Sequence, residues 1–245
     1  MEDTDLDGAT RGWSRGGRGG GEMISREIVE SVVRDVVTRR LTVPRTGVGG
    51  KTRSGPPLRV DASARHMHLC RADIDALFGP GYELTEYRPL YQPGNFAAKE
   101  MVTLIGPRSR VISNLRILGP LRPESQIELA YTDVISLGLE DVPVRLSGNV
   151  KDTPGAWIMG PKGMIQLKQG IIRAAIHVHM NPEDADFYGV KQGDLMKLRV
   201  GGPAAVTFEK VHVRIDKTVL LNIHMDTDEA NACGLHMAKE IELFR

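Results

Sequence analysis

Beyond residue 57 the sequence consists mainly of short apolar or alternating runs separated by glycine and proline. Alternation of apolar and polar residues is typical of β-strands with one buried face, and glycine and proline are typical of the turns between them. The pattern therefore favours a mainly β protein. The runs predict strands at residues 58–62, 101–105, 111–118, 126–131, 171–179, 195–200, 206–215 and 219–223.

Helices are expected to be few and short in this part of the chain. Residues 71–78 and residues 226–234 have helical patterns, and Asn181 followed by Pro182 marks the start of a further helix. Proline suits the first helical turn because its missing N–H group would have no partner there. We therefore predict a mainly β fold of the α+β class.

A His-X-His pair occurs twice, once as His66 and His68 and once as His177 and His179. Each pair ends a strand-like segment and is followed by a short acidic helix. This weak internal repeat predicts two tandem β-barrel domains capped by short helices, with the histidine pairs at related positions. The expected halves are residues 58–150 and residues 151–245.

The spacing of the histidines suggests metal binding. In an extended strand, side chains two positions apart point the same way, so both imidazoles of a pair can reach a single ion. The alternative is that each pair belongs to an exposed polar strand face. Two pairs in apolar surroundings favour metal, either as two ions or as one shared cluster.

Length and composition favour a soluble enzyme of a reducing compartment. Lys plus Arg total 32 and Asp plus Glu total 31, so the net charge of +1 gives no reason to expect nucleic acid or a membrane as a partner. The two cysteines, Cys70 and Cys233, cannot form a disulfide framework. No apolar run is long enough to span a membrane, and the acidic N-terminus does not resemble a signal peptide.

The N-terminal part divides into three segments. Residues 1–22 are acidic and then rich in Arg and Gly, which predicts a disordered tail, and Met23 is a possible alternative start. Residues 23–41 carry Ile and Val at helical spacing and predict an amphipathic helix. Residues 42–57 are rich in Pro and Gly and predict a flexible linker. The apolar helix face either docks on the chain's own domain or binds a partner.

Five motifs in order resemble the phosphate propanoyltransferases, the phosphotransacylases of bacterial microcompartments. They are SARHMHL at residues 63–69, LGPLRPESQIE at 118–128, VRLSGN at 144–149, AAIHVHM at 174–180 and HMDTDEAN at 224–231. The resemblance covers residues 58–243. It implies two tandem β-barrels with two zinc ions between them.

The resemblance also implies residue roles, position by position. One zinc would be bound by His66, His68 and Glu128, and the other by His177, His179 and His224. Arg122 would bind phosphate, and Arg122 and Ser147 are the candidate catalytic residues. The candidate contacts of coenzyme A are Ala62, Ser63, Ala64, Arg108, Arg116 and Asn231.

The activity implied is reversible transfer of a propanoyl group between coenzyme A and phosphate. The competing class is a zinc hydrolase with amidohydrolase-like chemistry, but that class needs eight β/α units, for which this chain is too short and too β-rich. A third class is a non-catalytic, shell-associated metal protein. The resemblance further implies shell or core proteins as partners through residues 23–41, a microcompartment in the bacterial cytoplasm as the location, and possible homo-oligomers.

If residues 23–41 form a helix that binds a partner, a chain beginning at Leu58 should keep its catalytic rate and lose its place in the shell, because few contacts should cross the linker. Residues 23–45 fused to a fluorescent protein should concentrate in the shell of cells that make it. Diffuse fluorescence, together with a large fall in melting temperature on truncation, would instead assign the helix to the core of the catalytic domain.

Overall fold

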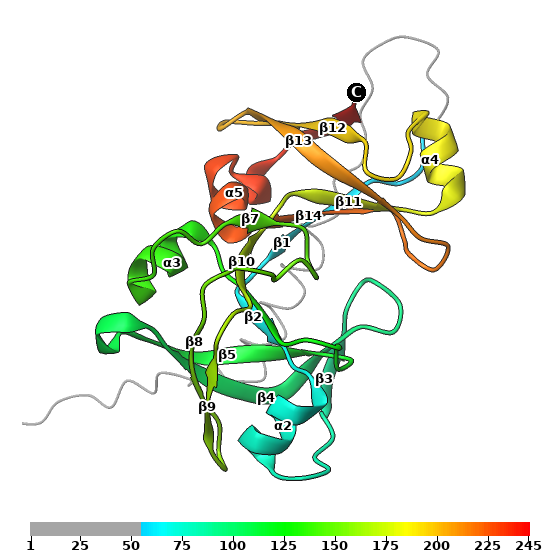
Figure 1. Ribbon diagram of the computed structural model, residues 1–245. Helices are drawn as coiled ribbons and strands as arrows, with labels where there is room; N and C mark the ends of the chain where they lie inside the picture. Colours follow the sequence, from blue (N-terminus) through cyan, green and yellow to red (C-terminus); the bar gives the residue numbers. More distant parts are fainter. Residues whose placement is uncertain (1–54) are drawn as a thin grey trace, which may run out of the picture. The chain divides into compact units, whose positions relative to one another are not determined.

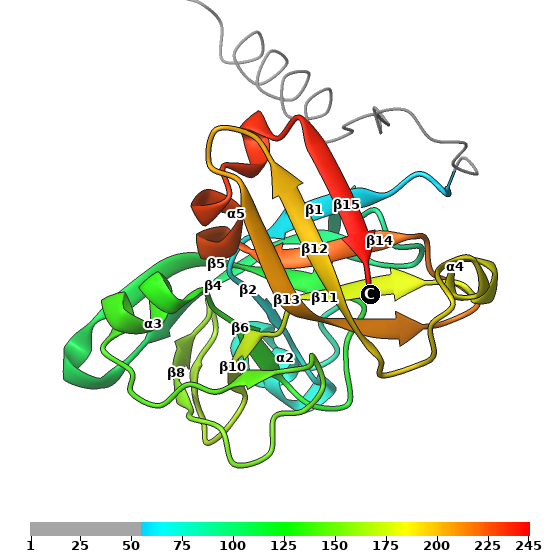
Figure 2. The same ribbon diagram turned by 90° about the horizontal axis from the view of Figure 1, so that it is seen from above.

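The computed structural model describes residues 55–245. The expected N-terminal tail and helix, and most of the expected linker, lie outside the described residues. In the described part, two curled half-barrel sheets account for most of the regular structure, and a few short helices lie at their edges (Figures 1 and 2). The expectation of a mainly β protein is confirmed.

The nine-stranded sheet occupies the lower part of Figure 1. Its strands run in the order β7-β10-β6-β2-β5-β4-β8-β9, and β3 pairs with β4. Its core includes Met67, Leu104, Ile117 and Ile127, none of which is exposed to solvent. The strands are β2 (His66–His68), β3 (Glu86–Pro89), β4 (Phe96–Ile105), β5 (Val111–Gly119), β6 (Gln126–Glu128), β7 (Val144–Arg145), β8 (Ala156–Met159), β9 (Met164–Leu167) and β10 (Ile171–Ala174).

The six-stranded sheet has its own core, which includes Val178, Leu198, Val211 and Ile223. Its strands run in the order β1-β14-β11-β13-β12-β15. The strands are β1 (Arg59–Ser63), β11 (His177–Met180), β12 (Leu195–Gly201), β13 (Val206–Ile215), β14 (Asn222–Asp226) and β15 (Glu240–Phe244).

The helices are short, and α2 covers the residues predicted from the sequence. They are α2 (Arg71–Phe78), α3 (Tyr131–Leu137), α4 (Pro182–Tyr188) and α5 (Thr227–Ala232), with 3₁₀ turns η1 (Pro107–Ser109) and η2 (Leu235–Met237). Among residues 55–245, no helix is both long and apolar enough to cross a membrane.

Helix α3 is a difference from the sequence prediction, which placed a strand at residues 126–131. The strand β6 ends at Glu128, and α3 begins at Tyr131. Asp133 accepts a hydrogen bond from the backbone N–H of Ala130 at 3.3 Å, and Val134 and Leu137 are buried against the first core. A helix start and two buried residues on one face therefore replace the expected strand end.

The expected internal repeat is present in the strand pairing. In the first sheet β2 lies between a parallel neighbour, β5, and an antiparallel neighbour, β6. In the second sheet β11 lies in the same way between β13 and β14. Helices α2 and α4 follow the two histidine strands, and α3 and α5 follow β6 and β14. The two histidine pairs thus occupy equivalent places.

The two halves exchange a strand. The strand before the first histidine pair, β1, pairs with β14 of the second sheet, and the strand before the second pair, β10, pairs with β6 of the first sheet. Strands β8 and β9 also belong to the first sheet. Each sheet therefore contains residues from both sides of the expected domain boundary at residue 150.

The cap of α5 contains a carboxyl group with an altered pKa. Glu229 accepts a hydrogen bond from the backbone N–H of Asp226 at 2.8 Å, and Asp226 accepts one from the N–H of Glu229 at 2.8 Å. In the equivalent cap of α3, Asp133 takes the place of Glu229 and forms an ion pair with Arg65 at 2.7 Å. The residue of the second half that is equivalent to Arg65 is Ile176, which has no charge to offer Glu229. Burial raises the pKa of Glu229 from 4.5 to about 7, and the charge of Asp226 adds to this.

Glu229→Gln should therefore stabilise the protein at alkaline pH. The raised folded-state pKa gives the wild type a stabilising contribution that is complete below pH 4.5 and is lost as the pH rises through about 7. Glutamine does not titrate and keeps an oxygen for the N–H of Asp226. In denaturant titrations the variant should be more stable than wild type at pH 8, with a gap that narrows toward pH 5.

The matched control is Glu242→Gln, which changes an exposed glutamate on β15. The difference in unfolding free energy between this variant and wild type should stay nearly constant over the same pH range. A pH-independent effect of Glu229→Gln would contradict the raised pKa.

Candidate active site

The first group of potential metal ligands lies on two adjacent strands. His66 and His68 are on β2, and Glu128 on β6 is the direct cross-strand partner of His66. The Nε2 atom of His66 lies 3.5 Å from Oε2 of Glu128. The potential ligand atoms of the three residues all lie within 4.8 Å of one another. The structure thus brings together three residues that are far apart in sequence and that the family resemblance had grouped.

Hydrogen bonding and charge suit this group to a metal ion. Nδ1 of His66 lies 2.8 Å from the carbonyl oxygen of Ala64, which leaves Nε2 free to bind an ion. Nδ1 of His68 is buried and has no hydrogen-bond partner among the described residues. An unsatisfied buried nitrogen is costly unless a ligand occupies it. Two imidazoles and one carboxylate form a donor set that zinc accepts.

The pKa shifts of His68 and Glu128 agree with this interpretation. Burial lowers the pKa of His68 to about 3, so its ring is neutral and keeps a free lone pair at neutral pH. Burial opposes ionisation of Glu128, but the charge and hydrogen bond of His66 outweigh it and hold the pKa of that carboxyl far below its usual value. For His66, burial is likewise outweighed by Glu128, which raises the histidine pKa.

The second group repeats the first on the other sheet. His177 and His179 are on β11, and His224 on β14 is the direct cross-strand partner of His177. The ring centroid of His177 lies 4.9 Å from that of His179 and 5.2 Å from that of His224. Nδ1 of His177 lies 2.8 Å from the carbonyl oxygen of Ala175, the same contact that His66 makes with Ala64. Burial lowers the pKa of all three histidines to about 4.

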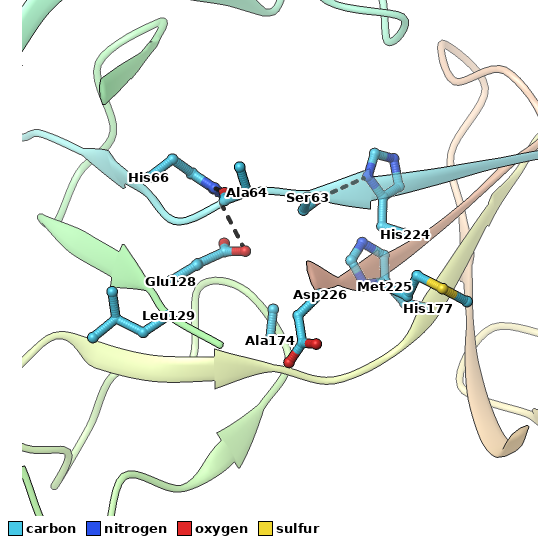
Figure 3. A pocket seen from close by; sticks show the side chains of 10 residues that line it. All are labelled: Ser63, Ala64, His66, Glu128, Leu129, Ala174, His177, His224, Met225 and Asp226. Carbon is cyan, nitrogen blue, oxygen red and sulfur yellow. Dashed lines mark hydrogen bonds and ion pairs between the residues drawn. The ribbon is translucent and has the colours of Figure 1, made fainter. Parts of the chain in front are cut away.

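The two groups share one pocket. Its lining includes His66 and Glu128 from the first group and His177 and His224 from the second, and Ser63 at the end of β1 lies between them. Figure 3 shows His66 facing Glu128, and Ser63 directed toward His224. Both ring nitrogens of His224 have polar neighbours, Nε2 at 3.0 Å from Nδ2 of Asn222 and Nδ1 at 3.4 Å from Oγ of Ser63, which lines the pocket.

A polar network connects Arg122 to this pocket. Nη1 of Arg122 donates to Oγ of Ser147 at 2.9 Å, and Ser147 donates to Oε1 of Glu128 at 2.8 Å. The buried side chain of Gln126 donates to both Glu128 and Ser147 and accepts from the N–H of Gly148. The two candidate catalytic residues are therefore held beside the first ligand group.

The candidate coenzyme A residues are not all in one place. Ser63 and Ala64 line the pocket, Ala62 precedes them on β1, and the backbone of Arg116 is paired with that of His66. Arg108, in contrast, lies in η1 beside a different cleft, which also contains Trp157 and Lys168. Asn231 is an exposed residue of α5.

Sequence reasoning overlooked Gln126 and Asn222. Each stands two positions before a third ligand, in Gln126-Ile127-Glu128 and Asn222-Ile223-His224, and so lies on the same face of its strand as that ligand. Gln126 is the cross-strand partner of His68, and Asn222 is that of His179. Alignment of the two halves on their histidine pairs would have provided the signal.

A mainly β protein with a His66, His68 and Glu128 group that could hold a metal ion belongs to the class of candidate metalloenzymes, and sequence comparison defines the class more narrowly. Residues 59–236 match the family model described as phosphate propanoyltransferase. Relatives with that name include proteins of Planctopirus limnophila, 50% identical over 91% of this chain and 92% of the relative, and of Thermotoga maritima, 46% identical over 75% and 87%. A relative from Listeria monocytogenes is 42% identical over 86% of this chain and 92% of its own length.

The chain therefore belongs to the phosphate propanoyltransferase family and is a transferase enzyme. The resemblance seen in the sequence motifs is confirmed.

Loss of one imidazole from either ligand group should remove both metal and activity. His66→Ala and His177→Ala should each lower the metal content of the purified protein and abolish turnover, because a missing ligand loosens the ion itself. Elemental analysis and a rate assay on the same samples test this.

His212→Ala is the matched control, because His212 is the strand neighbour of His177 on β13 but has no ring contact with the ligand histidines among the described residues. It should keep its metal and most of its activity. Equal damage by His212→Ala and His177→Ala would contradict this assignment of the ligands.

Proposed function

We propose that this enzyme converts propanoyl-CoA and phosphate reversibly into propanoyl phosphate and CoA, at a centre that binds two zinc ions. The observation that carries the proposal is the pair of equivalent ligand groups on one pocket. The name shared by the matched relatives supports the substrates. The proposed ligands are His66, His68 and Glu128 for one ion and His177, His179 and His224 for the other.

The donor sets fit zinc, since each offers three ligands and leaves a position open. Zinc bound there would act as a Lewis acid toward the thioester and the phosphate. The chain itself orients these ligands through the hydrogen bonds from His66 to Ala64 and from His177 to Ala175.

Arg122 is suited to bind the phosphate. The only hydrogen bond of its side chain among the described residues goes to Ser147, and no carboxylate oxygen lies within 4 Å of its guanidinium group. The remaining N–H donors form a fork that matches two phosphate oxygens. Burial lowers the pKa of Arg122, but a guanidinium group stays charged at neutral pH.

The proposed reaction is direct attack of phosphate on the thioester. A phosphate oxygen forms a bond to the carbonyl carbon, the carbon–sulfur bond breaks, and sulfur leaves with the electron pair. The proton of hydrogen phosphate passes through solvent to the sulfur, so the products are propanoyl phosphate and CoA thiol. Holding both reactants in one pocket supplies proximity.

A cysteine nucleophile is not needed for this reaction. Burial raises the pKa of the Cys233 thiol, which makes the reactive thiolate scarce. Cys233 packs in the second core, and neither it nor Cys70 lines the pocket with the histidines.

The pocket end of β1 is the proposed site for the thioester end of CoA. Ser63 and Ala64 line the pocket there, Ala62 precedes them on β1, and Arg116 on β5 is the backbone partner of His66. Arg108 and Asn231 remain proposed contacts of the nucleotide end, which is long enough to extend well beyond the pocket.

The remaining proposals concern assembly. Residues 23–41 are proposed as a targeting helix that binds shell or core proteins of a bacterial microcompartment, with residues 42–57 as its linker. The two half-barrels are proposed as the tandem barrel domains of the family. Amphipathic spacing and the Pro and Gly content of the linker support the first of these proposals.

The test is release of CoA thiol from propanoyl-CoA, with and without phosphate. Release should depend on phosphate, because phosphate is the nucleophile, and propanoyl phosphate should form in equal amount. An equal rate of release without phosphate would mean that water attacks the thioester. The zinc hydrolase alternative would then replace the transferase.

A further inference from the structure

Arg214 on β13 is a charged residue that the proposed mechanism does not use. It is the direct strand partner of His179, and it is only partly exposed. Among the described residues, its guanidinium group makes no hydrogen bond and no ion pair within 4 Å. Its position beside a ligand histidine and its free donors indicate a role toward a bound anion.

Arg214 lies on the sheet face that carries the histidines of β11. It is paired in parallel register with His179, and side chains at paired positions of neighbouring strands lie on the same face of a sheet. After burial, which is the largest cause, the positive charge of Arg214 also lowers the pKa of Arg122, which precedes β6 of the first sheet.

The internal repeat shows that this arginine is not a copy of Arg122. The connection from β5 to β6 and the connection from β13 to β14 have the same length, since equal numbers of residues separate Leu118 from Gln126 and Arg214 from Asn222. In this alignment Arg214 corresponds to Leu118, and Arg122 corresponds to Thr218. Each half thus contributes one arginine, Arg122 from the loop before β6 and Arg214 from strand β13.

Repulsion between two guanidinium groups destabilises the folded protein unless an anion lies between them. Neither Arg122 nor Arg214 has a carboxylate partner within 4 Å among the described residues. A phosphate dianion offers oxygens to both, and each arginine can present two parallel N–H donors.

We propose that Arg214 is a second phosphate-binding residue, which holds the anion from the His179 side while Arg122 holds it from the Glu128 side. This inference rests on the proposed function, in which phosphate is a substrate. It also accounts for the reverse reaction, because the same two arginines would bind the phosphoryl group of propanoyl phosphate.

The phosphates of CoA have the same chemistry, so the test must separate the two sources. The variants are Arg214→Gln and Arg214→Lys, with Arg199→Gln on the exposed face of β12 as the matched control. For each full-length protein, KM is measured for phosphate at saturating propanoyl-CoA and for propanoyl-CoA at saturating phosphate. Binding of inorganic phosphate alone is measured by calorimetry.

Arg214→Gln should raise KM for phosphate, and the phosphate Kd, by about tenfold or more, which is the size expected for loss of charged hydrogen bonds. KM for propanoyl-CoA should change less than about twofold. Arg214→Lys keeps the charge and so should fold, but it lacks the fork and should give an intermediate increase. Arg199→Gln should behave as wild type.

A rise in KM for propanoyl-CoA with an unchanged KM for phosphate would assign Arg214 to the phosphates of CoA and overturn the inference. Unchanged constants for both substrates would also overturn it. A wild type that releases CoA without phosphate would instead contradict the proposed function. In that case the calorimetric comparison still decides, because equal phosphate binding by wild type and both Arg214 variants would exclude the role.

Discussion

Direct cross-strand pairing of each histidine strand with its third proposed ligand is the constraint on which the site depends. His66 is paired with Glu128, and His177 is paired with His224. Side chains at directly opposed positions have Cβ atoms about 5 Å apart, which is close enough for both to reach one ion. A shift of the register by one residue would turn one partner to the other face of the sheet. Gln126 and Asn222, two positions away, are the cross-strand partners of His68 and His179, the second histidine of each group.

The exchange of β1 and β10 brings the two ligand groups onto one pocket. Each strand pairs with the sheet that does not contain the histidines following it. The chain therefore crosses between sheets directly before each histidine pair, at Ala64 and at Ala175, whose carbonyl oxygens also orient the first histidine of each pair. Each crossing thus contributes to the pocket wall and supplies the hydrogen bond that directs Nε2 of the first histidine toward the pocket.

Much of this fold was predictable from alternation, because β4, β5, β12 and β13 each bury one face. Helix α3 could not be predicted from alternation, because apolar residues continue past Glu128 and only tertiary packing ends the strand there. Histidine spacing predicted each pair, but Glu128 and His224 lie on other strands and were found only through the family motifs. Arg214 follows Lys210 and His212 on alternate positions, a pattern that looks like a solvent face in sequence and becomes part of the site only through its pairing with His179.

The most direct measurement is anomalous X-ray scattering from crystals of the enzyme on both sides of the zinc absorption edge. The account predicts two zinc peaks per chain, one between His66, His68 and Glu128 and one between His177, His179 and His224. A single peak shared by both groups, or no peak in crystals of protein that retains full activity, would contradict the two-metal centre.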